Sequence, residues 1–559
     1  MTTEITITIK PEDEKNLELH KKIIISELKK NVSQQKSKDA NEIKKLTLQD
    51  FKTHNATIKF LKKSIDARHG KIKLHLRYKV YIGENPTENE NALPQWKKVD
   101  GKKTVIIIGS GPAGLFGAFK LLESGIKPVI LERGAATSQR KIDIAKISTQ
   151  NIINSDSNYC FGEGGAGTFS DGKLYTRSNK RGNIYEVLNI FHYFGADEKI
   201  LTDAHPHIGT NKLPKIINNM CEKIVSLGGE IHFNTKVTDF LLSPNETDTT
   251  QKQKITGVKT KDTISGEEKS FTADSVLLAT GHSATDIYTL LAKIAPDSLE
   301  AKTFAAGVRV EHPRQLIDSI QYHSNKNHQL GAAEYRLTTQ VGDRGVYSFC
   351  MCPGGFVVPS SSGTDEIVVN GMSAAERNSQ WSNAAIVVEI RPEDIPLEFQ
   401  QKAKDSGCTQ IAGLLFRTHL EQLAKQHGKN QAAPAQLLKD FLENKKSSVL
   451  PKSSYTPGLQ SSNLCEWLPD HILSRLQQGF KDFNKYMKGF ICDEALLIAI
   501  ETRTSTPVRI LRDKETFESS AIKFLYPCGE GSGYSGGIVS SAMDGINACE
   551  QIAKQFNFL

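Results

Sequence analysis

Residues 109–114 read Gly-Ser-Gly-Pro-Ala-Gly, a spacing that brings polypeptide backbone close to a diphosphate. The first glycine permits a tight turn, the second lets a pyrophosphate approach the backbone, and the third lets a helix and a strand pack closely. A short β-branched run at 104–108 precedes these glycines, and a segment of helical character at 112–124 follows them. Free N–H groups and the positive end of that helix would face the phosphates, so the sequence predicts a nucleotide site.

An acidic residue follows at the position that such a site requires. Glu132 comes directly after a second predicted strand, 128–131, and lies 18 residues beyond Gly114. A carboxylate there can accept hydrogen bonds from an adenosine ribose. The same glycine pattern recurs at 162–167 and at 531–536. We interpret the first recurrence as a loop over a ligand, and the second, followed by only 23 residues, cannot form an independent dinucleotide domain.

Basic side chains and hydroxyl groups are concentrated at residues 501–509, Glu-Thr-Arg-Thr-Ser-Thr-Pro-Val-Arg. Arg503 and Arg509 would suit an anionic or carbonyl substrate, because arginine binds carboxylates bidentately. The alternative is a polar strand and turn that makes structural hydrogen bonds. His207 is a candidate base or ligand, and its alternative role is that of a polar cap in a loop.

Two cysteines, Cys350 and Cys352, form a further candidate pair. On an extended strand residues i and i+2 share a face, but their Cα atoms lie roughly 6.5–7 Å apart. That separation is at or beyond the usual range for a disulfide. The Pro-Gly-Gly that follows can supply a turn that brings the two together. They are therefore either a redox pair or two small buried side chains.

The pattern of predicted strands and helices changes twice along the chain. Residues 103–290 follow the order strand, glycine turn, helix, strand, and residues 291–500 hold longer strands and amphipathic helices. Residues 501–559 return to strand, glycines and helix. We expect an α/β domain that is interrupted and then completed from the far end of the chain. Residues 1–85 indicate a small α/β unit, joined by a linker at 86–102.

The individual elements follow from periodicity and turn residues. We expect an exposed polar loop at 31–42 and a final helix with one buried face after residue 537, where Ile538, Ala542 and Ile546 recur at four-residue spacing. The other expected elements are helices at 17–28 and 48–52 and strands at 5–9, 57–61, 72–82, 274–279, 307–311, 334–341, 345–351, 367–371 and 521–526.

Composition excludes several classes of protein. Hydrophobic residues make up 38% and charged residues 24% of 559, and apolar stretches are too short to span a membrane. The start resembles no signal peptide, and nine cysteines without repeated spacing favour a reducing, cytoplasmic location. No ligand pattern for a metal is present, so we expect none.

The positive charge of the chain is concentrated at its start. Net charge is +8, and residues 1–100 carry 21 Lys/Arg against 14 Asp/Glu, a net of +7. A basic segment can attract nucleic acid, but lysines on solvated helix faces are the ordinary explanation. Neither zinc-finger spacing nor an aromatic RNA-binding signature accompanies the lysines, so nucleic acid is not the expected partner.

The glycine turn, residues 274–281 (Asp-Ser-Val-Leu-Leu-Ala-Thr-Gly) and residues 528–538 together resemble the FAD-binding fold shared by glutathione reductase and p-hydroxybenzoate hydroxylase. Glu132 and Arg133 match the Glu-Arg pair that usually follows the second strand in that fold. Glu530 stands where those proteins have Asp, which lengthens its reach toward the ribityl chain.

A closer resemblance is to bacterial proteins described as FAD-dependent, or NAD(FAD)-utilising, dehydrogenases, most of them without an assigned substrate. It extends from about residue 60 to the end, and residues 161–174, 207–210, 351–359 and 501–509 match best. It implies a Rossmann-like FAD-binding domain (103–290 and 501–559), an inserted α+β substrate domain (291–500) and a small basic ferredoxin-like α/β domain (1–85).

The resemblance also implies which residues contact FAD. A helix that starts at Gly536 and Gly537 could face the flavin ring, and its N-terminus would stabilise the reduced flavin anion. The implied contacts are Gly109, Gly111, Pro112, Ala113, Gly114, Glu132, Arg133, Gly164, Gly165, Thr168, Val237, Thr280, Gly281, Gly529, Glu530, Gly536, Gly537 and Ile538.

The resulting expectation is an FAD-dependent oxidoreductase that transfers a hydride between flavin N5 and an organic small molecule or NAD(P)H. Because no separate nicotinamide domain is evident, NAD(P)H would bind transiently as electron donor. Two alternatives remain open, an RNA-modifying or RNA-binding flavoprotein that uses the basic N-terminal unit, and a non-catalytic flavoprotein that acts through interaction. Neither the substrate nor the oligomeric state is indicated.

Overall fold

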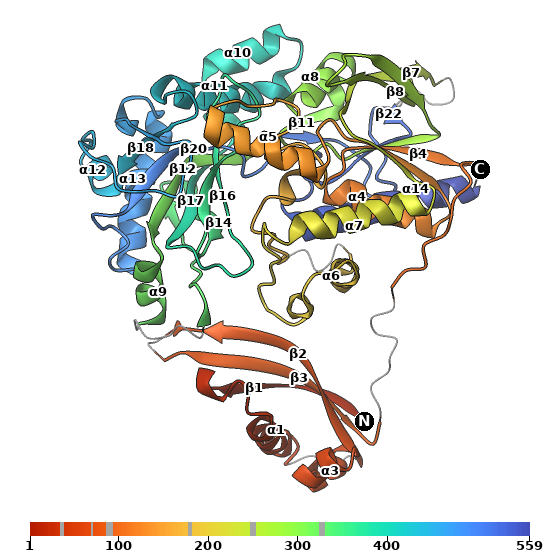
Figure 1. Ribbon diagram of the computed structural model, residues 1–559, viewed down its shortest axis with the longest axis vertical. Coiled ribbons are helices and arrows are strands. Elements are labelled where there is room, and N and C mark those ends of the chain that lie inside the picture. The colour runs from red at the N-terminus through yellow and green to blue at the C-terminus, as the bar shows by residue number, and fades with distance from the viewer. Residues whose placement is uncertain are drawn as a thin grey trace.

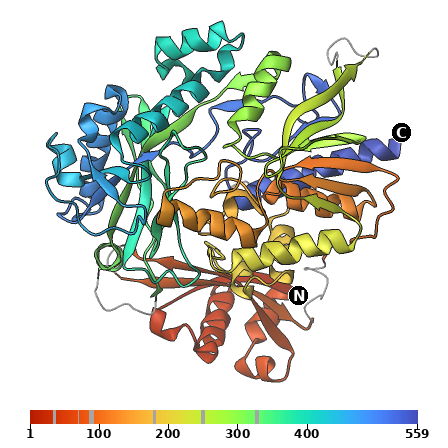
Figure 2. The same cartoon turned by 45° about the horizontal axis from the view of Figure 1, so that its top comes forward.

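The computed structural model describes residues 1–33, 38–68, 71–84, 93–176, 182–245, 253–323 and 330–558. Figure 1 shows two lobes side by side with a smaller N-terminal unit beneath them, and Figure 2 shows that this unit lies below both lobes. One lobe is built around a parallel sheet and the other around a larger, mostly antiparallel sheet.

The N-terminal unit is an antiparallel sheet of order β1-β3-β2 with helices against one face. Ile5, Ile7 and Ile9 alternate with exposed residues, and they pack with Ile24 and Leu28 in a core of their own. The elements are β1 (Thr2–Ile9), α1 (Leu17–Asn31), α2 (Lys38–Lys45), α3 (Leu48–Lys52), β2 (Ala56–Asp66) and β3 (Lys73–Ile82).

Two expectations for this unit are wrong. The loop expected at 31–42 is in part helix α2, because Ala40, Ile43 and Leu46 bury an apolar stripe against the sheet; residues 34–37 lie outside the described ranges. The described strands number three, whereas a ferredoxin-like β-α-β-β-α-β domain has four. In the described residues after β3, the next strand is β4 (Thr104–Ile108), which belongs to the first lobe.

The segment between this unit and the first lobe was expected to be a linker. Residues 85–92 lie outside the part of the chain that the structure describes. From residue 93 onward the chain follows the surface of the first lobe: Trp96 packs against Phe119 and Phe194, and the Val99 N–H donates to the Leu227 carbonyl at 2.9 Å. This stretch is therefore docked onto the lobe.

The first lobe contains a five-stranded parallel sheet of order β23-β10-β4-β5-β6. Its β4 is completely apolar apart from Thr104, as a strand covered on both faces should be. The strands are β4 (Thr104–Ile108), β5 (Lys127–Leu131), β6 (Glu230–His232), β10 (Ser275–Leu278) and β23 (Leu525–Pro527). Because β23 pairs in parallel with β10, the last part of the chain completes a sheet that the middle part began.

Helices and a small second sheet cover this parallel sheet. Helices α4 and α14 lie against each other on one face (Figure 1), in contact along their length. The elements are α4 (Pro112–Glu123), α5 (Thr137–Gln150), α6 (Ile184–Tyr193), α7 (Leu213–Ser226), β7 (Thr235–Pro244), β8 (Gln253–Asp262), β9 (Glu268–Thr272), α8 (Thr285–Ile294), β22 (Ile522–Lys523) and α14 (Ile538–Phe558).

The strand order creates a switch point beside β4. From β4 the chain adds β5 and β6 on one side, and later adds β10 and β23 on the other. Ligands of open α/β sheets bind where the order reverses, outside the carboxyl ends of the strands. Here those ends are Gly109, after β4, and Ala279, after β10, whose N–H donates to the Ile108 carbonyl at 2.9 Å.

The second lobe is a seven-stranded sheet of order β13-β14-β17-β12-β20-β18-β19, with helices on its outer face. The strand expected at 334–341 begins only at Thr338. The elements are β11 (Leu299–Ala301), β12 (Phe304–Pro313), α9 (Arg314–Tyr322), β13 (Thr338–Val341), β14 (Arg344–Cys352), β15 (Phe356–Pro359), β16 (Val369–Met372), β17 (Trp381–Ile390), α10 (Leu397–Asp405), α11 (Ala412–His427), β18 (Ala433–Leu437), α12 (Leu438–Leu442), β19 (Leu459–Ser461), α13 (Asp470–Tyr486), β20 (Leu496–Glu501) and β21 (Val508–Ile510).

The two lobes share a core. One buried apolar cluster extends from Ile106 and Val129 in the parallel sheet to Val346 and Phe480 in the second lobe. The space between the lobes is therefore bordered by elements packed into the same interior. Among the described helices, none combines the length and the apolar composition that crossing a membrane requires.

Candidate cofactor cavity and active site

A cavity of about 380 Å³ lies at the switch point, between the two lobes. Its wall combines the glycine turn after β4, the end of β10, the start of α14 and several residues of the second lobe. Of the eighteen residues expected to contact FAD, fifteen line it: Gly109, Gly111, Pro112, Ala113, Glu132, Arg133, Gly165, Val237, Thr280, Gly281, Gly529, Glu530, Gly536, Gly537 and Ile538. Residues more than 400 positions apart thus border one space.

The first glycine turn has the backbone geometry that its sequence predicts. Gly109 has φ of +103°, and a Cβ there would meet the Ala279 carbonyl oxygen at 2.5 Å. A Cβ on Gly114 would lie 2.0 Å from the Gly109 carbonyl oxygen, which shows how closely α4 approaches its strand. Helix α4 begins after Gly111 without a side-chain cap, so its first N–H groups are available at the cavity.

The cavity wall fits an extended ligand that lies against bare backbone. A Cβ added to Gly281, Gly536 or Gly537 would meet no atom within 4 Å, and one on Gly111 would meet only the Gly165 Cα, at 3.9 Å. Side chains at these positions would therefore occupy the cavity itself. With the free N–H groups of α4, this cradle suits the diphosphate of a dinucleotide such as FAD.

The remaining three expected contacts, Gly114, Gly164 and Thr168, do not line the cavity. Gly164 has φ of +78°, and a Cβ there would lie 2.1 Å from the Thr168 hydroxyl. That hydroxyl donates to the Glu163 carbonyl at 2.8 Å. Gly164 and Thr168 therefore shape the loop behind the wall, through the tight turn that the glycine permits, whereas Gly114 packs helix α4 against its strand.

Glu132 lies at the wall, but its carboxylate is already supplied with protein donors. One oxygen accepts the Ser110 N–H and hydroxyl at 2.9 and 2.7 Å, and the other accepts the N–H groups of Gly134 and Gly162 at 3.0 and 2.9 Å. These four donors match the hydrogen-bonding capacity of a carboxylate. Glu132 therefore ties the glycine turn to the 162–167 loop, a role beyond the expected contact with a ribose.

Glu530 and His282 form a polar pair at the opposite wall, where Glu530 Oε2 lies 3.4 Å from His282 Nε2. Burial raises the pKa of Glu530 to about 7 and lowers the pKa of His282 to about 3. The histidine is therefore neutral, and the carboxyl group titrates near neutral pH. His282 Nδ1 is buried and has no hydrogen-bond partner among the described residues.

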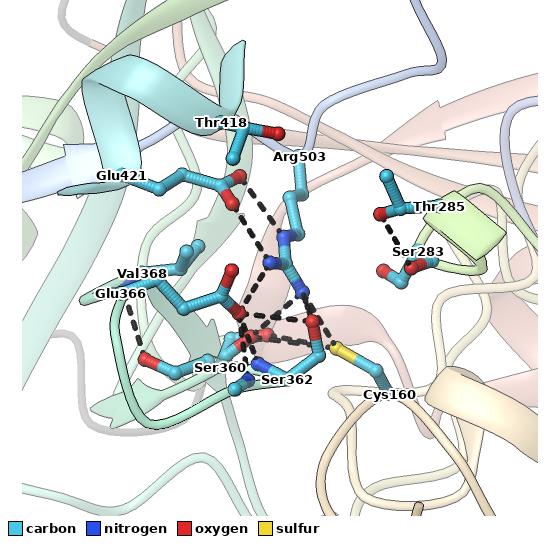
Figure 3. A network of polar contacts seen from close by, with 12 residues as sticks. Cys160, Ser283, Thr285, Ser360, Ser362, Glu366, Val368, Thr418, Glu421 and Arg503 are labelled. Carbon is cyan, nitrogen blue, oxygen red and sulfur yellow. Dashed lines mark hydrogen bonds and ion pairs between the residues drawn. The ribbon is translucent and has the colours of Figure 1, made fainter. Parts of the chain in front are cut away.

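Arg503 lines the cavity, but it does not fit the expectation of an anion-binding arginine. Figure 3 shows its guanidinium group held between Glu421 of α11 and the loop that carries Ser362 and Glu366. Nε donates to Glu421 at 3.1 Å, Nη2 to Glu421 at 2.9 Å and Glu366 at 2.6 Å, and Nη1 to Ser362 at 2.9 Å. With its N–H groups satisfied by protein and two carboxylates balancing its charge, Arg503 is a structural residue.

Two further candidates lie outside the cavity wall. Arg509 pairs with Glu300 at 2.7 Å and lies over the ring of Tyr534, so its charge faces the protein surface. His207 Nε2 lies 3.1 Å from the Ala375 carbonyl oxygen, and burial lowers the pKa of His207. Neither residue is positioned to contact a ligand in this cavity, because each is turned toward a local structural partner.

Cys350 belongs to the cavity wall, whereas Cys352 is completely buried behind it. Among the residues of the wall that sequence reasoning missed are three with polar side chains that could face a ligand, namely His282, Lys173 and Asn370. His282 directly follows the Ala-Thr-Gly at the end of β10, and Lys173 lies in the matching stretch 161–174, so proximity to a motif was a usable signal for both. Asn370 on β16 carries no such signal.

Comparison with known proteins adds two family matches. A model described as pyridine nucleotide-disulphide oxidoreductase matches residues 103–293, and one described as FAD-dependent protein, C-terminal domain-like, matches residues 303–504. An uncharacterised protein of Clostridium beijerinckii is 41% identical over 463 residues, which are 82% of each chain.

Among solved structures the likeness is weak. THI4 of Thermovibrio ammonificans is 17% identical, with a TM-score of 0.24 over 34% of this chain and 62% of its own. A geranylgeranyl bacteriochlorophyll reductase-like protein of Thermoplasma acidophilum is 11% identical, with a TM-score of 0.32 over 81% and 80%. Mycobacterium smegmatis Sdh1, solved with UQ1, is 15% identical, with a TM-score of 0.31 over 82% and 70%.

Proposed function

This chain belongs to the family of bacterial FAD-dependent proteins that includes the Clostridium beijerinckii relative, and on that premise we propose that it is an oxidoreductase that transfers a hydride between flavin N5 and an organic substrate or NAD(P)H. One observation carries the proposal: the glycine turn at 109–114 and the start of α14 border the same cavity. Bound FAD would supply two-electron chemistry there.

Different residues of the cavity wall would contact different parts of the cofactor. The N–H groups at the start of α4 would hold the diphosphate, and Glu132, Arg133 and Val237 would lie along the adenosine. Gly536 and Gly537, at the start of α14, would lie against the ring. In this proposal residues 103–290 and 501–559 form the FAD-binding domain, and residues 291–500 cover its open side.

Glu530 is the group best suited to hold or release a proton in this cavity. Its pKa of about 7 permits both protonation states at neutral pH, and the neutral His282 beside it can exchange a hydrogen bond with either state. Lys173 and Asn370 would face the substrate from the same wall. NAD(P)H would bind transiently in this cavity, because no second nucleotide-binding cradle is identified in the described residues.

The purified protein should show flavin absorption near 450 nm, and anaerobic NADH or NADPH should bleach it. Gly111→Ala should weaken FAD binding at least tenfold, because a Cβ there projects into the cavity while the backbone angles suit alanine. Gly363→Ala, which adds a Cβ no closer than 3.8 Å to other atoms, is the matched control. Equal FAD affinity in the two variants would contradict the proposed site. Bleaching only by a different donor would exclude NAD(P)H.

A further inference from the structure

The strand that carries Cys350 and Cys352 is not regular where they lie. On β14, Phe349 lies opposite Ala385 of β17. Three residues later Cys352 lies opposite Asn383, which is only two residues from Ala385 on β17. The strand thus contains a β-bulge, which re-aims side chains and shortens the path along the strand.

The bulge shortens the expected distance between Cys350 and Cys352, which bears on whether they can form a disulfide. Three residue steps of β14 occupy the length of two, about 6.8 Å, so Cys350 and Cys352 lie closer together than on an extended strand. The Cys352 thiol donates to the Cys350 carbonyl oxygen at 3.3 Å. Cys350 itself has φ of +44°, an uncommon conformation for a residue other than glycine, and such outliers gather at functional sites.

The two thiols have different surroundings. Cys350 lines the cofactor cavity and is partly exposed in it, whereas Cys352 is inaccessible behind it. A Cβ on Gly371 would lie 2.9 Å from the Cys352 sulfur, so that thiol is enclosed. The arrangement provides one thiol that a reactant can reach and one that only its neighbour can reach.

Two cations lie beside the pair, and each is also paired with a carboxylate, Lys173 with Asp171 at 2.8 Å and Arg309 with Glu501 at 3.0 Å. Lys173 Nζ lies 3.9 Å from the Cys352 sulfur and also lines the cavity, and Nη1 of the buried Arg309 donates to the Cys350 carbonyl at 3.3 Å. The Cys352 thiol, aided by Lys173 and Arg309, holds the pKa of Cys350 well below the ordinary value, against the effect of burial. The neighbouring Cys350, together with burial, raises the pKa of Cys352.

The other cysteines lack this environment. Burial raises the pKa of six of them, and none of the six lines the cavity: Cys221, Cys408, Cys465, Cys492, Cys528 and Cys549. Cys160 lines the cavity, but its sulfur lies against the Ser360 carbonyl and Arg503 without a second thiol. A cysteine with a lowered pKa and a second cysteine beside it is found only at 350 and 352.

We propose that Cys350 and Cys352 are a redox-active pair that exchanges two electrons with the flavin and takes a disulfide compound as its substrate. This inference rests on the proposed function, because the flavin is its electron partner. The pair belongs to a strand of the second lobe rather than to the segment that follows the glycine turn.

The proposed reaction consists of two thiol–disulfide exchanges followed by one two-electron reduction. The Cys350 thiolate attacks one sulfur of the substrate disulfide, forming a mixed disulfide and releasing one substrate thiolate, which takes up a proton. Cys352, after losing its proton, attacks Cys350 in turn, so a Cys350–Cys352 bond forms and the second substrate thiol leaves. The Cys350–Cys352 bond would then accept two electrons from bound reduced FAD and two protons from solvent, which would restore the dithiol and leave the cofactor oxidised.

Lys173 is a positioning residue in this proposal, since its ammonium group lies beside the Cys352 sulfur and lowers the pKa of Cys350 without reacting. The charged or titratable groups that act on the pair from the surrounding elements are Lys173, Arg309, Asp171, Tyr335, Glu501 and Glu530. Lys173→Met should move the pH profile of Cys350 alkylation by iodoacetamide to higher pH. An unchanged profile would overturn the role of Lys173.

The decisive experiment counts electrons in the full-length holoprotein. After air oxidation, anaerobic dithionite titration should reduce each flavin and also deliver about two further electrons per flavin to the disulfide. Cys350→Ser and Cys352→Ser should lose these two electrons and keep the flavin absorption, which also reports correct folding. Cys492→Ser, a half-buried cysteine outside the cavity, should behave as the wild type.

Thiol labelling provides a second measurement that does not depend on flavin. In glutathione buffers of increasing oxidation, Cys350 and Cys352 should lose alkylation together, and their peptide should become two mass units lighter. At neutral pH Cys350 should react at least tenfold faster than Cys492. If flavin binds and is reduced but no buffer produces the disulfide, the redox-pair inference fails and the FAD proposal stands. If no flavin binds, the proposed function fails while labelling still reports on the pair.

Discussion

His282 Nε2 and Glu530 Oε2 lie 3.4 Å apart, and this contact joins the segment after β10 to the segment after β23. The two residues are separated by nearly 250 positions, because the whole second lobe is inserted between them. Burial lowers the pKa of His282 and raises the pKa of Glu530, so it favours the neutral form of each side chain. When β23 pairs with β10 and completes the parallel sheet, it therefore also brings together the two residues whose protonation states characterise this part of the cavity wall.

Glu530→Gln should alter how stability depends on pH. The folded-state pKa of about 7 lies above the ordinary 4.5, so Glu530 contributes stability below pH 4.5 that is lost as pH rises through 7. Replacing it should stabilise the protein at pH 8 relative to pH 5 by about 2 kcal/mol. Urea unfolding at both pH values measures this, with exposed Glu398→Gln as the control. An identical pH dependence in wild type and Glu530→Gln would contradict the assigned pKa.

Arg503→Met should destabilise the protein strongly. It leaves the Glu366 carboxylate without its cation and leaves Glu421 with only Arg417, at 3.8 Å, and breaking a buried pair in this way costs about 3–5 kcal/mol. Arg509→Met removes a surface pair with Glu300 and a contact with the Tyr534 ring, and should cost about 1 kcal/mol. Denaturant unfolding compares the two. If Arg503→Met instead kept full stability and lost only substrate affinity, Arg503 would be a binding residue after all.

Gly545→Ala should separate the two helices that meet at the cofactor cavity. A Cβ at this position of α14 would lie 2.1 Å from the Ala113 carbonyl oxygen of α4, and backbone atoms cannot move aside as a side chain can. We expect a lower melting temperature and accelerated FAD release. Lys554→Ala, on the same helix with an exposed side chain, should change neither. Unchanged FAD retention in Gly545→Ala would show that this close approach is dispensable.

Removal of residues 1–92 should leave the flavin spectrum intact. The N-terminal unit has its own apolar core, and Lys63 exchanges backbone hydrogen bonds at 2.9 Å with Thr202 and Ala204 of the first lobe. Absorption and thermal unfolding of the truncated protein test this expectation. Salt-dependent RNA binding that disappeared on truncation would support the nucleic-acid alternative. Loss of FAD would instead show that the unit stabilises the cavity.

Local patterns were sufficient for much of the first lobe. The glycine turn at 109–114, with a strand before it and a helix after it, follows from φ requirements and from neighbouring residues. The final helix and the family of FAD-dependent proteins were also predicted correctly from short motifs. In the N-terminal unit, by contrast, helix α2 was missed because its apolar stripe gains stability only by packing against the sheet.

By itself the sequence determined the turns, the alternating or helical periods and the motifs that a cofactor-binding backbone requires, because these depend on residues within one or two turns of chain. Only the tertiary structure decided the chemistry of individual side chains. Four donors, three of them from other segments, surround Glu132, two carboxylates hold Arg503, and pairing with β17 places the bulge at Cys350. Burial and long-range partners set charge and reactivity, and neither is contained in local spacing.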